Sequence, residues 1–339
     1  MPLVSVIIVN YNGIGLLEDC LGSLREQTFR DFEVILVDNA SSDGSVAFVR
    51  GNDPEVTVLQ NHKNLGYGGG NNAGIMMAKG EYLCLLNNDT KADTNWLLKL
   101  VEAASRGDKN VGMFASKILN YDHPDVIDNT GLFMFRDGIA RGRGRLEKDS
   151  GQFGSHEEVF FPSGCAGFYK KEMLDEIGLF DEDFFLYLDD VDIGLRARMN
   201  GWKCIYVSDA MVYHKYSASS DPYSPLKAYF VERNRIWIVI KYFPFGMAMA
   251  SPLYSLVRYL LQAYGIVTGR GASSRLVKSG SVLQTVGILC KAYISALSVF
   301  GTMLNKRREM AKLRRVSMRE ISEWFKKFGI SAREVAFKD

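Results

Sequence analysis

Residues 4–12 read Val-Ser-Val-Ile-Ile-Val-Asn-Tyr-Asn and residues 33–39 read Glu-Val-Ile-Leu-Val-Asp-Asn, and these two stretches decide the fold. Each is a short run of branched apolar residues followed at once by polar side chains, as is typical of a buried parallel strand. Between them, a helical face is formed by Leu16, Leu17, Cys20, Leu21 and Leu24. The order strand, helix, strand predicts an α/β fold.

The same alternation continues along the chain. Strand signals recur at 56–59, 82–86, 204–207 and 210–213, and helical patterns at 73–79 and 190–200. We therefore expect a mostly parallel central sheet covered by helices. Residues 121–160 are rich in Gly, Arg and Asp, which predicts a mobile surface loop over the site.

Polar residues follow the predicted strands. They read Asn10-Tyr11-Asn12, Asp38-Asn39, Asn64-Leu-Gly66-Tyr-Gly-Gly-Gly-Asn71-Asn72 and Asn87-Asn88-Asp89. Ligands of open α/β sheets bind beyond the carboxyl ends of the strands, so a binding site is predicted there. The glycine run does not fit a dinucleotide fingerprint, because GxGxxG counted from Gly66 requires glycine where Asn71 stands.

Charge and cysteine content limit the class of protein. The first 215 residues hold 21 Lys and Arg against 32 Asp and Glu, whereas residues 216–339 hold 20 against 7. Such asymmetry indicates an anionic surface as partner of the second part. Five cysteines without a CxxC pair argue against a disulfide framework and a zinc ribbon. No leader sequence precedes the first strand, so we expect a cytoplasmic protein.

Three groups of residues are candidates for chemistry. Asp89 at a strand end is a possible ligand for Mg²⁺ or Mn²⁺, although a turn or helix cap is the ordinary role there. Asp189 and Asp190 open a helix, where acids commonly interact with the helix dipole, but the aromatic residues before them can raise a carboxylate pKa towards that of a general base. His214 ends a strand, where a lone histidine is usually structural.

Six motifs resemble, in order and spacing, the inverting family 2 glycosyltransferases. They are VSVIIVNYNG, FEVILVDNASSDGS, NLGYGGGNNAGI, YLCLLNNDT, FDEDFFLYLDDVDIGLRARMNGW and VYHK. The resemblance covers residues 3–240 and looks closest to the bacterial rhamnosyltransferases and galactofuranosyltransferases of surface polysaccharide synthesis. It implies a GT-A fold in a catalytic domain of residues 1–240. The charge and apolar pattern beyond it predict a helical, basic, membrane-associating region of residues 241–339.

The resemblance also implies roles for residues. Asp190 would be the catalytic base, with Asp189 in the position of the family's glutamate. Nucleotide-sugar binding would fall to Asn10, Tyr11, Asp38, Gly66, Asn71, Asn72, Asn87, Asn88, Ser163, Gly164 and Arg233. Asp89 would hold the divalent metal, with His214 as a further ligand. Asn87 replaces the first acid of the family's D-x-D motif, which leaves the metal one carboxylate fewer.

The C-terminal part carries apolar and basic segments. Residues 242–257 are too short and too proline-rich for a membrane span, and Lys291 interrupts 282–305. We read 282–305 as an amphipathic helix, followed by basic residues and an apolar face of Ile321, Trp324, Phe325 and Phe328. This pattern favours a peripheral position on the inner face of the cell membrane. A packing module with a solvated basic face is the alternative, and no motif accompanies the charge to indicate nucleic acid.

The expected reaction transfers rhamnose from dTDP-rhamnose to a saccharide acceptor, polyprenyl-diphosphate-linked, with inversion and with Mg²⁺ or Mn²⁺ as cofactor. A UDP-linked galactofuranose or hexose is the alternative donor. A non-catalytic nucleotide-sugar-binding protein is the alternative from another class. A nucleotidyltransferase is disfavoured because no glycine-rich phosphate loop bearing Lys or Arg follows the first strand.

Overall fold

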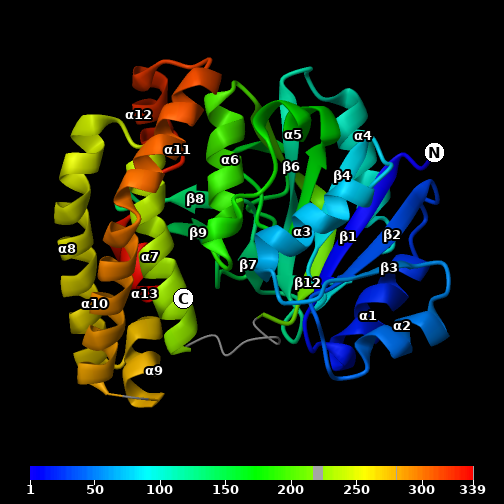
Figure 1. The fold of residues 1–339 in the computed structure, drawn as a ribbon, viewed down its shortest axis with the longest axis horizontal. Coiled ribbons are helices and arrows are strands. Elements are labelled where there is room, and N and C mark those ends of the chain that lie inside the picture. The colour runs from blue at the N-terminus through cyan, green and yellow to red at the C-terminus, as the bar shows by residue number, and fades with distance from the viewer. Residues whose placement is uncertain (217–223, 280, 339) are drawn as a thin grey trace. The chain divides into compact units, whose positions relative to one another are not determined.

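The structure is a computed structural model that describes residues 1–216, 224–279 and 281–338 (Figure 1). The chain divides into two compact units. The first comprises Met1–Leu132, Gly142–Ala197 and Trp202–Ser220, and the second comprises Phe133–Arg141, Arg198–Gly201 and Asp221–Asp339. The division differs from the predicted boundary after residue 240, because α7 (Pro225–Tyr242) packs against other helices of the second unit.

The first unit is built on a ten-stranded sheet in the described residues. The strand order is β10 (Glu157–Val159), β12 (Lys203–His214), β6 (Val111–Asn120), β11 (Ala166–Lys170), β4 (Tyr82–Leu86), β1 (Val4–Asn10), β2 (Phe32–Asp38) and β3 (Thr57–Gln60), with β5 (Thr90–Ala92) on β12 and β7 (Ile127–Asn129) on β6. The long strands share one direction except β11, which runs antiparallel to β4 and β6. The predicted mostly parallel sheet is confirmed.

Five helices pack on this sheet, α1 (Ile14–Arg25), α2 (Ser45–Asn52), α3 (Gly66–Met77), α4 (Trp96–Arg106) and α5 (Lys171–Ile177), and α6 (Asp189–Met199) follows them in the chain. The sequence predicted an apolar face for the first of them. In α1 the buried residues are Leu17, Cys20, Ser23, Leu21 and Leu24. Leu16, also assigned to that face, is only half-buried.

The glycine run 66–70 is helical, whereas the sequence predicted a helix over 73–79 only. Close contact between α3 and β1 explains why glycine is used despite its low helix propensity. A Cβ atom at Gly70 would lie 2.7 Å from Val9 Cγ1, and one at Gly74 would lie 2.5 Å from Ile7 Cγ2. The glycines thus bring α3 against the sheet at the edge where the polar residues lie.

Residues 121–160 are not a mobile loop, and that prediction was wrong. The segment contains β7, β8 (Leu132–Met134), β9 (Ala140–Gly142) and β10, and β7 and β10 pair with the main sheet. Ion pairs fix it further, since Lys117 Nζ lies 2.6 Å from Asp149 Oδ2. The composition misled because its glycines and arginines serve hairpin turns and buried ion pairs.

The second unit is helical. Its helices after α7 are α8 (Phe245–Thr268), α9 (Gly271–Ser279), α10 (Val282–Ser298), α11 (Phe300–Leu313), α12 (Met318–Lys327) and α13 (Ala332–Phe337). Capping boxes begin α12 at Ser317 and α13 at Ser331. In the described ranges no single helix meets the length and hydropathy criteria of a membrane span, whereas α10 and α11, bent by 59°, meet them as a pair.

The apolar face of the C-terminal tail is an internal packing face. Ile321, Phe325 and Phe328 are buried within the second unit. The ring of Phe325 lies 4.8 Å from that of Phe243, and Phe328 packs on Phe133. The interpretation of these side chains as membrane anchors was therefore wrong: the amphipathic pattern was present, but other helices of the unit cover it.

Candidate active site

Three of the predicted donor-binding residues form one hydrogen-bonded chain at the ends of β1, β2 and β4. The side-chain amide of Asn88 donates to Asn10 Oδ1 at 2.8 Å, and the amide of Asn10 donates to Asp38 Oδ1 at 3.3 Å. The parallel register pairs Asn10 with Asp38, which explains why they meet. All three are buried, whereas Tyr11 beside them is 49% exposed. Hydrogen-bonded, buried polar side chains thus lie next to the exposed ring of Tyr11.

The N-terminal turns of α3 carry the next predicted group. Gly66 has a φ of +74°, and a Cβ there would lie 2.1 Å from the carbonyl oxygen of Phe185. Asn71 donates to the Tyr67 carbonyl at 3.0 Å. Asn72 donates to the carbonyl of Phe180 at 3.0 Å and accepts from the Phe180 N–H at 2.9 Å. Asn72 therefore holds the segment that leads into α6.

Asp190 lies at the start of α6 in a position set by backbone donors. Its Oδ2 accepts from the Gly164 N–H at 2.9 Å, and its Oδ1 accepts from the Val191 N–H at 2.8 Å. The residue as a whole is half-buried. A carboxylate held in a fixed orientation is what a general base requires.

Asp189 and Asp190 interact as a pair of like charges. Burial raises the pKa of Asp190. Burial and then the charge of Asp190 raise the pKa of Asp189 well above its usual value. In the described part of the chain, Asp189 Oδ2 is buried without a hydrogen-bond partner. The polypeptide before them is strained, since Phe185, Tyr187 and Leu188 have φ angles of +63°, +66° and +63°.

Asp89 and His214 lie side by side because β5 pairs antiparallel with β12, which sets Thr90 opposite His214. The distance from His214 Nε2 to Asp89 Oδ1 is 3.3 Å. Both side chains are buried, and Asp89 Oδ1 accepts no hydrogen bond from the described residues. An acceptor oxygen and an imidazole nitrogen thus face one another without a good hydrogen bond between them.

Asp128 was missed by the sequence analysis, and it orients His214. Its Oδ2 lies 2.7 Å from His214 Nδ1, and its other oxygen is paired with Arg145. Arg145 in turn stacks over Tyr216 with its guanidinium carbon 4.2 Å from the ring centre. In the neutral ring, the hydrogen bond from Nδ1–H to Asp128 leaves the Nε2 lone pair to bind a cation beside Asp89. No sequence motif marks Asp128, which lies in the short strand β7 within the segment that was predicted to be a mobile loop.

The charges around His214 determine its protonation. Burial by itself lowers the pKa of His214, but Cys165 and the carboxylates of Asp128 and Asp89 raise it, and the net pKa lies well above its usual value. Desolvation also raises the pKa of Cys165, which favours the neutral thiol. Without a bound cation, an imidazolium would therefore compensate the two carboxylates.

Asp89 and His214 fit a divalent cation, because the buried Asp89 Oδ1 has no hydrogen-bond partner among the described residues. Bonds of about 2.0–2.1 Å in an octahedral shell put neighbouring ligand atoms about 3 Å apart, close to the separation of Asp89 Oδ1 and His214 Nε2. Among the described residues no three His, Cys, Asp or Glu side chains form a metal-binding group. Mg²⁺ and Mn²⁺ commonly complete such a shell with substrate phosphates and water.

Residues 163–165 connect these two groups. The Gly164 N–H contacts Asp190, and the Cys165 carbonyl accepts from the Asn87 N–H at 2.9 Å. The Gly164 carbonyl accepts from the Tyr67 hydroxyl at 2.5 Å. Asn87 itself is half-buried beside Asp89. The segment that begins at Ser163 therefore joins the end of β4, α3 and the start of α6 into one site.

Arg233 belongs to the second unit, where it lies on α7. Its guanidinium carbon is 4.1 Å from the Trp237 ring centre and 4.7 Å from that of Phe230. Its assignment to the leaving diphosphate stays a prediction.

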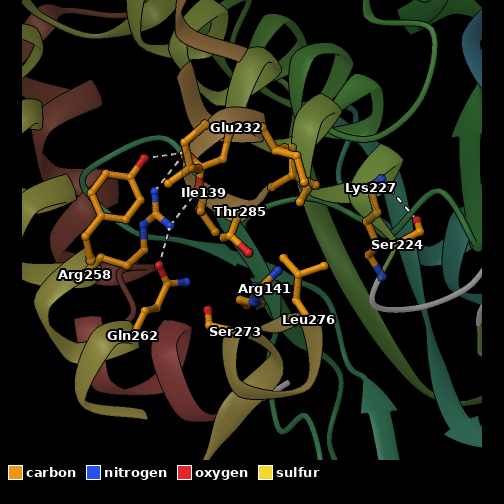
Figure 2. A pocket seen from close by; sticks show the side chains of 15 residues that line it. Ile139, Arg141, Ser224, Lys227, Glu232, Arg258, Gln262, Ser273, Leu276 and Thr285 are labelled. Carbon is orange, nitrogen blue, oxygen red and sulfur yellow. Dashed lines mark hydrogen bonds and ion pairs between the residues drawn. The ribbon is translucent and has the colours of Figure 1, made fainter. Parts of the chain in front are cut away.

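The second unit also contains a cavity of about 130 Å³, which holds none of the predicted site residues. Figure 2 shows it between α7, α8, α9 and α10, with Lys227 and Ser224 at one end and Arg258 and Gln262 at the other. Its remaining lining is largely apolar, including Ile139, Val231, Leu276, Ile288 and Leu289.

The fold and these strand-end residues define a GT-A-type glycosyltransferase. Two solved structures share the fold. A mannosyltransferase, PcManGT from Pyrobaculum calidifontis, in complex with GDP-Man and Mn²⁺, superposes with a TM-score of 0.51 at 18% identity over 92% of this chain and 86% of its own. GalNAc-T7 with UDP, GalNAc and Mn²⁺ superposes with a TM-score of 0.60 at 17% identity over 77% and 51%.

The chain belongs to glycosyl transferase family 2, whose sequence profile matches residues 5–178. It is 30% identical over 253 residues to an N-acetylglucosaminyl-diphospho-decaprenol L-rhamnosyltransferase of Mycobacterium tuberculosis, covering 66% of this chain and 80% of that protein. It is 28% identical to a GalNAc(5)-diNAcBac-PP-undecaprenol beta-1,3-glucosyltransferase of Campylobacter jejuni, covering 63% of each. It is 26% identical to protein y4gI of Sinorhizobium fredii, an uncharacterised protein, covering 64% of this chain and 25% of that longer one.

Proposed function

We propose that this chain is a metal-dependent, inverting glycosyltransferase that moves rhamnose from dTDP-rhamnose to a polyprenyl-diphosphate-linked saccharide. One observation carries the proposal: the first unit holds both an oriented carboxylate with a raised pKa, Asp190, and the adjacent side chains of Asp89 and His214. Two relatives carry names that state polyprenyl-diphosphate-linked acceptors, and one of them is a rhamnosyltransferase. These names support the acceptor class and the donor.

In the reaction, Asp190 accepts the proton of the acceptor hydroxyl. That oxygen attacks the anomeric carbon from the face opposite the diphosphate, so the new glycosidic bond forms as the bond to the phosphate oxygen breaks. The electron pair leaves with the nucleoside diphosphate, and a single displacement inverts the anomeric centre. The Gly164 N–H keeps Asp190 Oδ2 in place during the transfer. The raised pKa of Asp190 strengthens it as a base.

Asp89 and His214 would hold the divalent cation, with Asp128 fixing the imidazole. A bound cation neutralises charge that develops on the departing diphosphate. Asn10, Asp38 and Asn88 would position the nucleoside, with Tyr11 against the base. Asn87, Gly66, Asn71, Asn72 and Ser163 would complete the donor surface.

We place the enzyme on the inner face of the cytoplasmic membrane. The excess of 20 Lys and Arg over 7 Asp and Glu in residues 216–339 supports attraction to anionic lipids, at about 1 kcal/mol per charge near the surface. A polyprenyl-linked acceptor is held in the same membrane, so this position would concentrate enzyme and acceptor together.

The test measures release of nucleoside diphosphate from a panel of dTDP- and UDP-sugars with Mn²⁺ or Mg²⁺, in the presence of a polyprenyl-diphosphate-linked saccharide. We expect turnover of dTDP-rhamnose that is abolished by EDTA and by Asp190→Asn. Asp175→Asn is the matched control, because Asp175 is an exposed carboxylate on α5. It should retain wild-type turnover.

The other outcomes are informative. Turnover of a UDP-sugar in place of dTDP-rhamnose would replace the donor and keep the mechanism. Turnover that survives EDTA would remove the metal from the proposal. Binding of a donor without turnover of any, in the folded protein, would overturn the enzyme in favour of a nucleotide-sugar-binding protein.

A further inference from the structure

Helix α8 in the second unit exposes a continuous apolar face. Its exposed large apolar residues are Phe245, Met249, Leu253, Leu256, Val257, Leu260, Tyr264 and Val267, with exposed fractions from 48% to 87%. They recur every three or four positions, which places them on one side of the helix. At 1.5 Å per residue this face is about 33 Å long. Figure 1 shows α8 at the edge of the second unit.

The exposed surface of α8 is also uncharged. Arg258 is the helix's only charged residue, and it is 1% exposed. Its Nε lies 2.6 Å from Asp137 Oδ2 and its Nη1 lies 2.8 Å from Glu232 Oε1, so the charge is compensated inside the unit. A contiguous exposed apolar surface of this size marks an interaction site more often than not.

The chain around α8 is basic and lacks carboxylates. From Arg233 to Arg308 there is no Asp or Glu, while the stretch contains 11 Lys and Arg. Arg235, Lys241 and Arg258 are buried, and the exposed cations of the stretch include Arg270, Arg275, Lys291 and Arg308. Helix α10 lies in this stretch and also exposes apolar residues, at Leu283, Val286, Ile294 and Leu297. A surface that attracts both apolar side chains and cations is an anionic lipid bilayer. A second copy of the chain fits less well, because its helices would bring the same positive charge.

We propose that the apolar face of α8 docks the protein on an anionic membrane surface, with the helix lying in the plane of the headgroups. The proposal deepens the membrane position included in the proposed function and rests on it for its biological purpose. The membrane anchor is then α8 and not the C-terminal tail, since Ile321, Phe325 and Phe328 of the tail are buried. From the sequence, this part of the chain was considered only as a membrane span.

The test is sedimentation with vesicles of phosphatidylcholine alone or mixed with phosphatidylglycerol. Leu253→Gln with Leu260→Gln removes apolar contact without adding charge, and Leu253→Glu with Leu260→Glu adds repulsion. Both side chains are exposed, at 67% and 63%, so folding should be retained. We expect partition into the mixed vesicles to fall at least tenfold for the Gln pair and further for the Glu pair.

Met76→Glu with Met77→Glu is the matched control, because both residues are exposed apolar residues of α3 in the first unit. The control adds the same charge and should reduce partition by less than twofold. Wild-type partition of the α8 variants would overturn the proposal. So would a change from dimer to monomer in the α8 variants without lipid, together with unchanged partition, since a second copy would then cover the face.

Donor turnover in the same samples separates the two proposals. Loss of vesicle binding by the α8 variants, with donor hydrolysis at the wild-type rate, supports the docking face alone. If wild type turns over no donor but the α8 variants still lose partition, the proposed function fails and the docking face stands.

Discussion

Two site carboxylates of the first unit and two buried carboxylates of the second unit are partnered differently. In the first unit, Asp89 Oδ1 and Asp189 Oδ2 lack hydrogen-bond partners among the described residues. In the second unit, Asp137 and Glu232 are paired with Arg258, and Glu232 is also 2.5 Å from Arg235 Nε. A buried carboxylate oxygen without a hydrogen bond costs stability, so at the strand ends it favours a ligand-binding or catalytic role, whereas the fully paired carboxylates of the second unit favour a structural one.

The sharpest test of this contrast is Asp190→Asn, which keeps the size of the side chain. We expect kcat/KM for sugar transfer to fall by about 10²–10⁴-fold, the usual contribution of a general base. Thermal unfolding should show a much smaller loss, because asparagine keeps one of the two oxygens that accept from the Gly164 and Val191 N–H groups. A loss of stability as large as the loss of activity would assign Asp190 to the structural class instead.

The converse substitution is Glu232→Gln in the second unit. Removal of one partner of a buried ion-pair network typically costs about 3–5 kcal/mol. Here Arg235 would lose its paired carboxylate, and Arg258 would keep Asp137 alone. Denaturant unfolding measures this loss. Glu309→Gln, at an exposed pair with Lys312, is the control and should change stability little.

The pH dependence of unfolding also tests whether the ion pairs of Glu232 stabilise the second unit. Burial raises the pKa of Glu232, but the charges of Arg258 and Arg235 lower it more, to about 2 from an ordinary 4.5. The stabilisation from this group is therefore present above pH 4.5 and is lost as the pH falls from there towards 2. Glu232→Gln should remove that part of the acid dependence. An unchanged profile would show that other acids account for it.

A smaller effect is expected at Asp128, which touches His214 rather than the reacting atoms. Asp128→Asn should weaken Mn²⁺ binding by about 10–100-fold, the usual range for a group that orients a metal ligand. Titration calorimetry or Mn²⁺ magnetic resonance reads this without activity. Asp125→Asn is the control, since Asp125 is an exposed neighbour paired with Lys148. Equal Mn²⁺ affinity in wild type and Asp128→Asn would remove the orienting role.

The smallest expected change is a shift of pH dependence in Asp189→Asn. The folded pKa of Asp189 is raised, so wild type loses stability as the pH rises through that pKa. The variant should lose less over the same range. The acid limb of kcat/KM should stay in place, because burial rather than the charge of Asp189 raises the pKa of Asp190. An acid limb that moves to lower pH in the variant would show that Asp189 is charged while Asp190 titrates.

Much of the first unit could be predicted from local pattern. The strands at 4–10, 32–38 and 82–86 are formed by the runs of branched apolar residues themselves. The polar residues after these strands meet because parallel strands end at the same edge of the sheet. The hairpins within 121–160 could not be predicted, because their strands are short and their charges are compensated by residues remote in sequence.

The sequence by itself determined the strands at 4–10, 32–38 and 82–86, the family, and the residue types at Asp89, Asp190 and His214, because these depend on neighbours along the chain. The tertiary structure decided that Asp128 holds His214, that Asn72 holds the Phe180 segment, and that α8 rather than the C-terminal tail exposes its apolar face. Periodicity reveals that one side of a helix is apolar, but what covers that side depends on the packing of distant segments.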